Sequence, residues 1–166
     1  NTTITIDLYR ENTKDKVVNQ LAKDVSSHLK ESGSSVLVPN AKSFNAKNVL
    51  LVKGFQDGDQ IHKLISMYQS IAQKGNQLKA KDISIMPGTV YPKGKCEMWL
   101  IEMVAKTIES NVYIFSETCN KTAKKPSVKK LNILVSSLTN SDLIKAKNAA
   151  KKGYAIGEGV NSAKYL

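Results

Sequence analysis

The sequence predicts an α/β domain, layered α/β/α with a mixed and largely parallel sheet, followed by a C-terminal helix. Short apolar or alternating segments, typical of strands, recur along the chain, and segments with helical apolar spacing lie between them. Such alternation is typical of sheets whose strands are joined by crossover helices. The chain of 166 residues is long enough for one domain with a core. We therefore divide it into a domain at 1–139 and a linking helix at 140–166.

The first half of the chain contains three expected strands and one expected helix. Residues 3–9 alternate apolar and polar side chains, which predicts a half-buried strand. Residues 14–31 carry one apolar face at helical spacing. Residues 34–39 form a short strand that Pro39 stops, and the nearly continuous apolar run 48–54 is typical of a strand buried on both faces.

The middle of the chain repeats this alternation. The turn QDGD offers Asp57 or Asp59 as the cap of a helix that we expect to end near Gly75. A strand at 82–88 leads to a helix at about 95–110. The side chains that we expect to point inward from this helix are Leu100, Ile101, Val104, Ala105 and Ile108.

The last part of the chain is predicted to hold two more strands and a long helix. NVYIFSE at 111–117 and the apolar run 131–137 are the strands, with a basic loop at 121–130 between them. Asn140 or Ser141 is expected to cap the final helix, which runs to the end.

Positive charge is concentrated toward the C-terminus. The chain has a net charge of +11, and residues 121–166 hold ten lysines against only Asp142 and Glu158. This balance permits contact with a polyanion, and a solvated lysine-rich surface is the alternative. The only arginine is Arg10, whereas readers of nucleic acid usually favour arginine. The candidate contacts are Lys124, Lys125, Lys129 and Lys130.

The cysteines, the apolar runs and the first residues of the chain indicate the cellular compartment in which we expect the protein. Cys96 and Cys119 are too few for a disulfide framework, and we expect them to be reduced thiols in a reducing compartment. No apolar run approaches the roughly 20 residues that span a bilayer. The first residues lack the basic start and apolar core of a secretory signal. We expect a cytoplasmic location, with a mitochondrial one as the alternative.

The residues that could carry chemistry form no recognised motif. His28 and His62 are 34 positions apart and show no metal-binding spacing, and no glycine-rich phosphate loop is present. Glu97, Glu102 and Glu109 are expected on the polar side of their helix, and Trp99 is expected to pack. We therefore predict no catalytic and no metal-binding residue in this chain.

Two stretches resemble the leucyl (cytosol) aminopeptidase family. KAKNAAKKGYAIGEGVNSAKYL at 145–166 is similar to the family's interdomain helix, A-x-A-I-A-x-G-x-N-x-A-R-x-L, with Lys164 in place of the usual Arg. Residues 110–137 look like its Y-x-F strand, lysine-rich loop and apolar strand, with Ile114 in place of a frequent Arg. The matching positions are Tyr113, Phe115, Ala155, Ile156, Gly159, Asn161, Ala163 and Leu166.

The resemblance implies an N-terminal domain similar to macro domains, followed by a catalytic domain that holds two divalent metals, zinc or manganese. The family assembles as hexamers, and its metal ligands all lie beyond the position that matches Leu166. The expected function is the non-catalytic N-terminal domain of a metallopeptidase that removes N-terminal residues from peptides, with a role in assembly and active-site access. Three alternatives stay open: a nucleic-acid-binding module, a nucleotide or ADP-ribose pocket, and a structural family member without activity.

The small residues of the last helix are expected to pack against that catalytic domain. Glycine costs a helix roughly 1 kcal/mol relative to alanine, so its presence calls for a packing reason. Helical spacing places most of the small and apolar side chains on one face, with Gly157 on the neighbouring strip. The predicted interdomain residues are Gly153, Ile156, Gly157, Val160 and Ala163, and a frayed helix end is the alternative.

Overall fold

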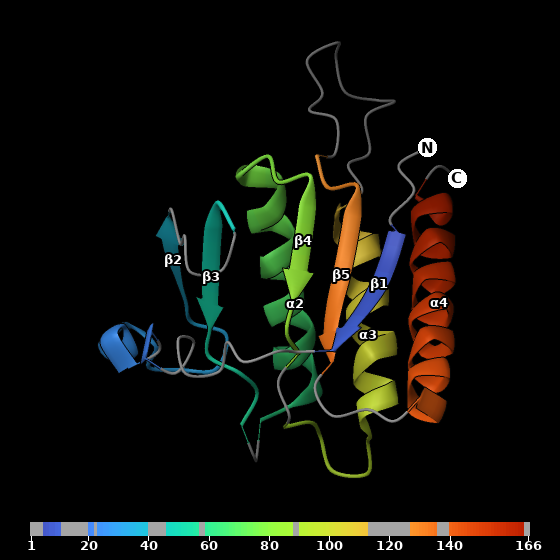
Figure 1. Cartoon of the computed structure of the whole chain (residues 1–166), viewed down its shortest axis with the longest axis horizontal. Helices are drawn as coiled ribbons and strands as arrows, with labels where there is room; N and C mark the ends of the chain where they lie inside the picture. The colour runs from blue at the N-terminus through green and yellow to red at the C-terminus, as the bar shows by residue number, and fades with distance from the viewer. Residues whose placement is uncertain are drawn as a thin grey trace.

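A parallel three-stranded sheet lies at the centre of the structure (Figure 1), which is a computed structural model. Its strand order is β1 (Thr5–Arg10), β5 (Lys130–Val135) and β4 (Asp82–Ile85), so β5 pairs on both sides. Parallel neighbours need a crossover connection, and α3 (Glu97–Val112) supplies it between β4 and β5. The structure describes residues 5–10, 20–21, 23–39, 46–56, 59–87, 90–112, 127–135 and 140–164.

A second sheet consists of the antiparallel strands β2 (Ser35–Pro39) and β3 (Asn48–Val52). We predicted that the second of these strands would be buried on both faces, and this is wrong. All five residues of β3 are only half-buried. Among the described strands β3 pairs with β2 alone, so this sheet is only two strands wide.

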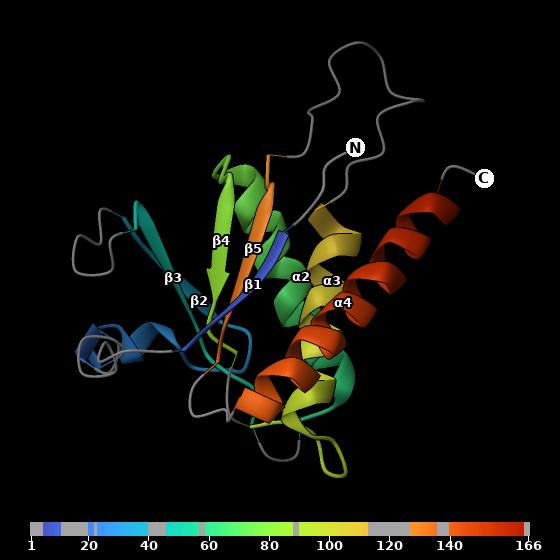
Figure 2. The same ribbon diagram turned by 45° about the vertical axis from the view of Figure 1, so that its right-hand side comes forward.

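Three helices lie on the same side of the parallel sheet (Figures 1 and 2). They are α2 (Ile61–Gln77), α3 and α4 (Asn140–Ala163). The central helix α3 packs against α2 on one side and α4 on the other, and α4 also contacts β1. None of the described helices is long and apolar enough to cross a membrane.

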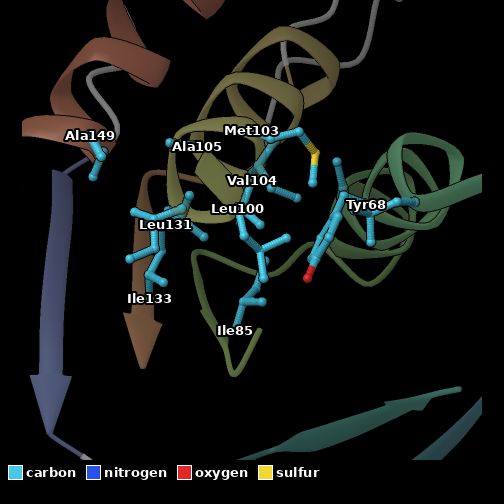
Figure 3. Packing of buried hydrophobic residues seen from close by; sticks show 14 of the residues in the cluster. Tyr68, Ile85, Leu100, Met103, Val104, Ala105, Leu131, Ile133 and Ala149 are labelled. Atoms are coloured by element: carbon cyan, nitrogen blue, oxygen red, sulfur yellow. The ribbon is translucent and has the colours of Figure 1, made fainter. Parts of the chain in front are cut away.

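The core lies between the sheet and these helices (Figure 3). Alternate residues of β5 are buried because only one face of the strand meets the helices. Leu131 and Ile133 from β5 meet Leu100 and Val104 of α3 there, and Tyr68 of α2 closes one side. All five side chains that the sequence places inward on α3 are buried, as predicted. The predicted layered α/β domain with a C-terminal helix is confirmed.

The helix predicted at 14–31 ends earlier than expected. Residues 20, 21, 23 and 24 are helical, and a 3-10 turn, η1 (Ser26–His28), follows. The Ser26 hydroxyl donates to the carbonyl oxygen of Lys23 over 2.8 Å, which offers the backbone an alternative to the regular helix. Val17, Val18 and Ala22 of the predicted apolar face lie outside the described residues, whereas Leu21, Val25 and Leu29 are described and half-buried.

The helix α3 extends past its predicted end. Asn111 and Val112 were expected to begin a strand, but both are helical. Val112 lies four residues after Ile108 and continues the apolar stripe, which explains the extra half turn. The rest of the predicted strand, with Tyr113 and Phe115, lies outside the described residues, as do positions 121–126 of the basic loop. The strand β4 ends at Ile85, three residues before its predicted end.

Candidate functional site

Two glycines of α4 allow it to lie directly against α3. A Cβ atom on Gly153 would come within 2.1 Å of the backbone oxygen of Glu102, and one on Gly157 within 2.7 Å of the Cβ of Glu109. Real side chains do not approach this closely, so both positions require glycine. In the same order along both helices, Lys152 pairs with Glu102 and Asn161 with Glu109. The helices α3 and α4 are therefore parallel neighbours in close contact.

The five residues predicted to form an interdomain surface do not share one environment. Gly153 and Gly157 are buried against α3 of this same domain, so for these two the prediction is corrected. Their small size serves a contact within the domain. Ile156, Val160 and Ala163 are exposed, with 37% of Ile156 and 38% of Val160 accessible. An interdomain role for these three stays a prediction.

Side chains from α2, from α4 and from the turn directly after α4 hold the carboxyl end of α3. The Asn161 amide donates to the carbonyl oxygen of Glu109 over 3.1 Å, and the Lys164 ammonium donates to that of Ser110 over 2.7 Å. The Asn76 amide of α2 donates to the carbonyl oxygen of Val112 over 3.0 Å. The last carbonyl oxygens of a helix have no backbone N–H donor within the helix, so these side chains supply the missing hydrogen bonds. We call Asn76, Asn161 and Lys164 the α3 clasp.

The clasp connects the C-terminal helix to the rest of the domain. The Asn161 side chain also accepts a hydrogen bond from Lys164 over 3.2 Å, so these two side chains of the clasp are joined. Asn76 accepts hydrogen bonds from the backbone and hydroxyl of Ser127, both at 3.3 Å, just before β5. The clasp therefore joins α2, α3, α4 and the approach to the central strand.

Glu109 is buried between α3 and α4, which corrects the prediction that it lies on a polar face. Only 6% of the residue is exposed. Its Oε1 accepts from the Asn161 amide over 3.3 Å, and its Oε2 is buried with no hydrogen-bond partner among the described residues. Burial, followed by the negative charge of Glu158, raises the pKa of Glu109 to about 7, against the lowering effect of the Asn161 hydrogen bond. The site therefore favours the protonated carboxyl.

Asn76 was not singled out from the sequence and Glu109 was predicted on the polar face of its helix, although the sequence contains a signal for the burial of Glu109. Glu109 lies four residues after Ala105, whose Cβ would lie 3.1 Å from a Cβ on Gly153. The i, i+4 spacing places both on one strip of α3. A second buried strip on α3, facing another helix, could have been inferred from these small residues. Asn76 has no comparable signal, because its partners lie 36 and 51 positions away.

One sequence prediction made Asp59 the cap of α2, and this is wrong. The Asp59 carboxylate instead holds the loop before the helix. Its Oδ2 accepts from the backbone N–H of Gln56 over 2.9 Å and from the Ser32 hydroxyl, and Lys63 donates to its Oδ1. The hydrogen bonds from Ser32 and then Gln56 lower the pKa of Asp59 to about 2. The cap position of α2 is Gln60, and it makes no side-chain capping bond. The alternative cap, Asp57, lies outside the described residues.

The remaining candidates show no shared site. His28, His62 and Cys96 are exposed, and Cys119 lies outside the described residues. Trp99 packs against the core, as predicted, with the Lys95 ammonium 5.2 Å from its ring centroid. In the described part of the chain, no three His, Cys, Asp or Glu side chains lie close enough to hold a metal ion.

The lysines proposed to contact a polyanion are only partly described. Lys129 is exposed and Lys130 is half-buried at the start of β5. Lys124 and Lys125 lie outside the described residues. Contact with a polyanion therefore stays a prediction.

Comparison with known proteins yields a likeness in fold. No protein-family model and no curated protein sequence matches the chain. Among solved structures, a mutant form of leucine aminopeptidase from tomato is similar, with a TM-score of 0.61 and 15% sequence identity. The similarity covers 89% of this chain and 35% of the tomato protein's chain. The fold is therefore similar to part of a leucine aminopeptidase, and the chain spans about a third of that protein's length.

Proposed function

We propose that this chain is the non-catalytic N-terminal domain of a leucyl-aminopeptidase-like metallopeptidase. The likeness in fold to leucine aminopeptidase over 89% of the chain is the observation that carries the proposal. The resemblance of 145–166 to the family's interdomain helix supports it independently, since that comparison rests on residue types and spacing. In this proposal the domain supports assembly of the full-length protein and shapes access to its active site.

In this proposal, the helix α4 would fix the orientation of the following domain. Its buried strip, with Gly153, Gly157 and Asn161, is fixed to α3 of this domain. Its exposed apolar residues Ile156 and Val160 leave a strip on which a following domain can pack. A helix that is fixed along one strip and carries an exposed apolar strip beside it is suited to hold a second domain in one orientation.

The peptidase chemistry would belong to the following domain. Two divalent metals, zinc or manganese, would be held there, and we assign no reaction step to residues of this chain. A homohexamer and a cytoplasmic or mitochondrial location are proposed on the resemblance alone.

Two experiments test the proposal. The purified chain, assayed with a leucine amide substrate with added zinc or manganese, should show no hydrolysis above the metal-only blank. The full coding sequence should continue after Leu166 with an N-x-P-x-N motif and, further on, the Lys, Asp and Glu ligands of a two-metal centre. Hydrolysis by the purified chain, or a coding sequence without that motif, would contradict the proposal. The motif without the ligands would indicate a family member that has lost activity.

A further inference from the structure

We propose that the Glu109 carboxyl is a proton-operated latch: when protonated it holds the C-terminal half of α4 on α3, and when ionised it releases that half. The inference concerns this chain by itself and does not depend on the proposed function. It begins from the buried contact between Glu109 and Gly157, where the glycine leaves room for the carboxyl-bearing side chain and little else.

The packing explains why the charge state matters at this position. A Cβ on Gly157 would lie 2.7 Å from the Cβ and 2.8 Å from the Cγ of Glu109, so the side chain lies directly on the backbone of α4. Water is excluded there, and Oε2 has no partner among the described residues. An ionised carboxylate in this position loses its hydration, and among the described residues it gains in return only the Asn161 amide as a hydrogen-bond donor.

The charged groups around the carboxyl add to this effect. From α4, Glu158 is the neighbour whose charge opposes ionisation of Glu109, and the Tyr154 hydroxyl donates to the Glu158 carboxylate over 3.0 Å. Lys164, in the turn directly after α4, donates to Asn161 and to the Ser110 carbonyl. On α3 itself, Lys106 is one turn earlier and exposed. The pKa of about 7 that burial and Glu158 give Glu109 places the change in a range that a cell reaches.

The release should be local because the two ends of α4 are held differently. The first half of the helix buries Ala146, Ala149 and Ala150 in the core. The second half, from Gly157 to Ala163, is held by Glu109, by Asn161 and by Lys164 in the turn that follows the helix. Loss of the Glu109 contact therefore weakens the second half first, while the core around β5 stays closed.

Hydrogen exchange read by mass spectrometry on the whole chain tests the latch. After correction for intrinsic exchange, protection of amides 157–164 should fall as pH rises through the range between about 4.5 and about 7, the two pKa values of the open and closed carboxyl. The expected slope is about tenfold per pH unit, because each opening releases one proton there. Protection of amides in β5 should not follow the same slope.

Matched variants separate the latch from other carboxyls of the same two helices. Glu109→Gln, a neutral side chain of the same shape, should hold the protection of 157–164 at its low-pH level throughout. Glu102→Gln, in the exposed pair with Lys152, should leave the wild-type pH dependence unchanged. Glu158→Gln should make the loss of protection level off at a lower pH. It removes the charge that opposes ionisation of Glu109 and so lowers the pKa of the closed carboxyl.

Several results would overturn the latch. They are a wild-type chain without this pH dependence, a Glu109→Gln variant that keeps it, and a parallel loss of protection in β5. Should Glu109→Gln fail to fold, the carboxyl carbon of Glu109 can be followed by NMR in the wild-type chain. The latch is supported if the chemical shift of this carbon titrates above pH 6 and the amide shifts of 157–164 change over the same pH range. A titration below pH 5 overturns it.

Discussion

Asn161 on α4 donates a hydrogen bond from its side-chain amide to the backbone carbonyl oxygen of Glu109, 52 positions earlier on α3, over 3.1 Å. The same amide reaches the Glu109 carboxyl over 3.3 Å. Asn161 is also one of the positions at which the chain resembles the interdomain helix of leucyl aminopeptidases. In this structure Asn161 has a role inside the domain, because it fixes the C-terminal part of α4 against the end of α3.

Replacement of Asn161 by alanine should destabilise the domain by about 1–3 kcal/mol, because the buried carbonyl of Glu109 loses its donor. Asn148→Ala is the matched control, since Asn148 is exposed on the same helix and is predicted to be neutral or slightly stabilising. Urea unfolding at neutral pH measures both. Equal effects of the two substitutions would show that the hydrogen bond contributes nothing beyond helix propensity.

Asn76→Ala should also lower the free energy of unfolding by about 1–3 kcal/mol, since it removes the donor to Val112 and the acceptor for Ser127. Gln73→Ala, on the exposed face of the same helix, should change it little. If the clasp acts as a unit, the double variant Asn76→Ala with Asn161→Ala should depart from additivity in a double-mutant cycle. Strict additivity would mean that the two side chains hold the end of α3 independently.

Asp59→Asn should remove a pH-dependent contribution to stability. The pKa of Asp59 is lowered from 3.8 to about 2, so the ionised carboxylate stabilises the folded chain above pH 3.8 and this contribution is lost as pH falls through about 2. The wild-type chain should therefore be more stable than Asp59→Asn at pH 6, and the difference should shrink toward pH 2.

Asp82→Asn, at an exposed carboxyl, is the control for that series. Urea unfolding at pH 6, 4 and 2.5 gives the comparison. A constant difference between Asp59→Asn and the wild type at all three values would contradict the assignment of the loop contacts to the ionised Asp59.

The parts of the fold that follow from local patterns were predicted well. Alternation and apolar spacing located β2, β5 and the inward face of α3, because burial on one face repeats with the period of the element. Helix ends were predicted less well. The early end near Ser26 depends on a side-chain hydrogen bond to the backbone, which a hydrophobic pattern does not contain. The late end at Val112 follows the apolar stripe of α3 two residues further than we predicted.

The candidate site was predicted only in part, for a related reason. The spacing of small residues in α4 correctly indicates close packing, but it does not say which neighbour is packed. The sequence favoured a following domain, and for Gly153 and Gly157 the neighbour is α3. The burial of Glu109 depends on a contact between residues about 50 positions apart, so it follows from matching the small residues of α3 and α4 and not from the periodicity of α3 alone.

The packing of α4 on α3 is tested most directly by two identical substitutions six residues apart in one helix. In Gly153→Ala the new Cβ would lie 2.1 Å from the Glu102 backbone, and the helices must separate, at a cost of about 1–3 kcal/mol. At Gly159 a Cβ meets nothing within 4 Å, so Gly159→Ala should stabilise the chain by up to about 1 kcal/mol through helix propensity. Urea unfolding of both variants should therefore give changes of opposite sign, and stabilisation by both would show that α4 does not lie against α3.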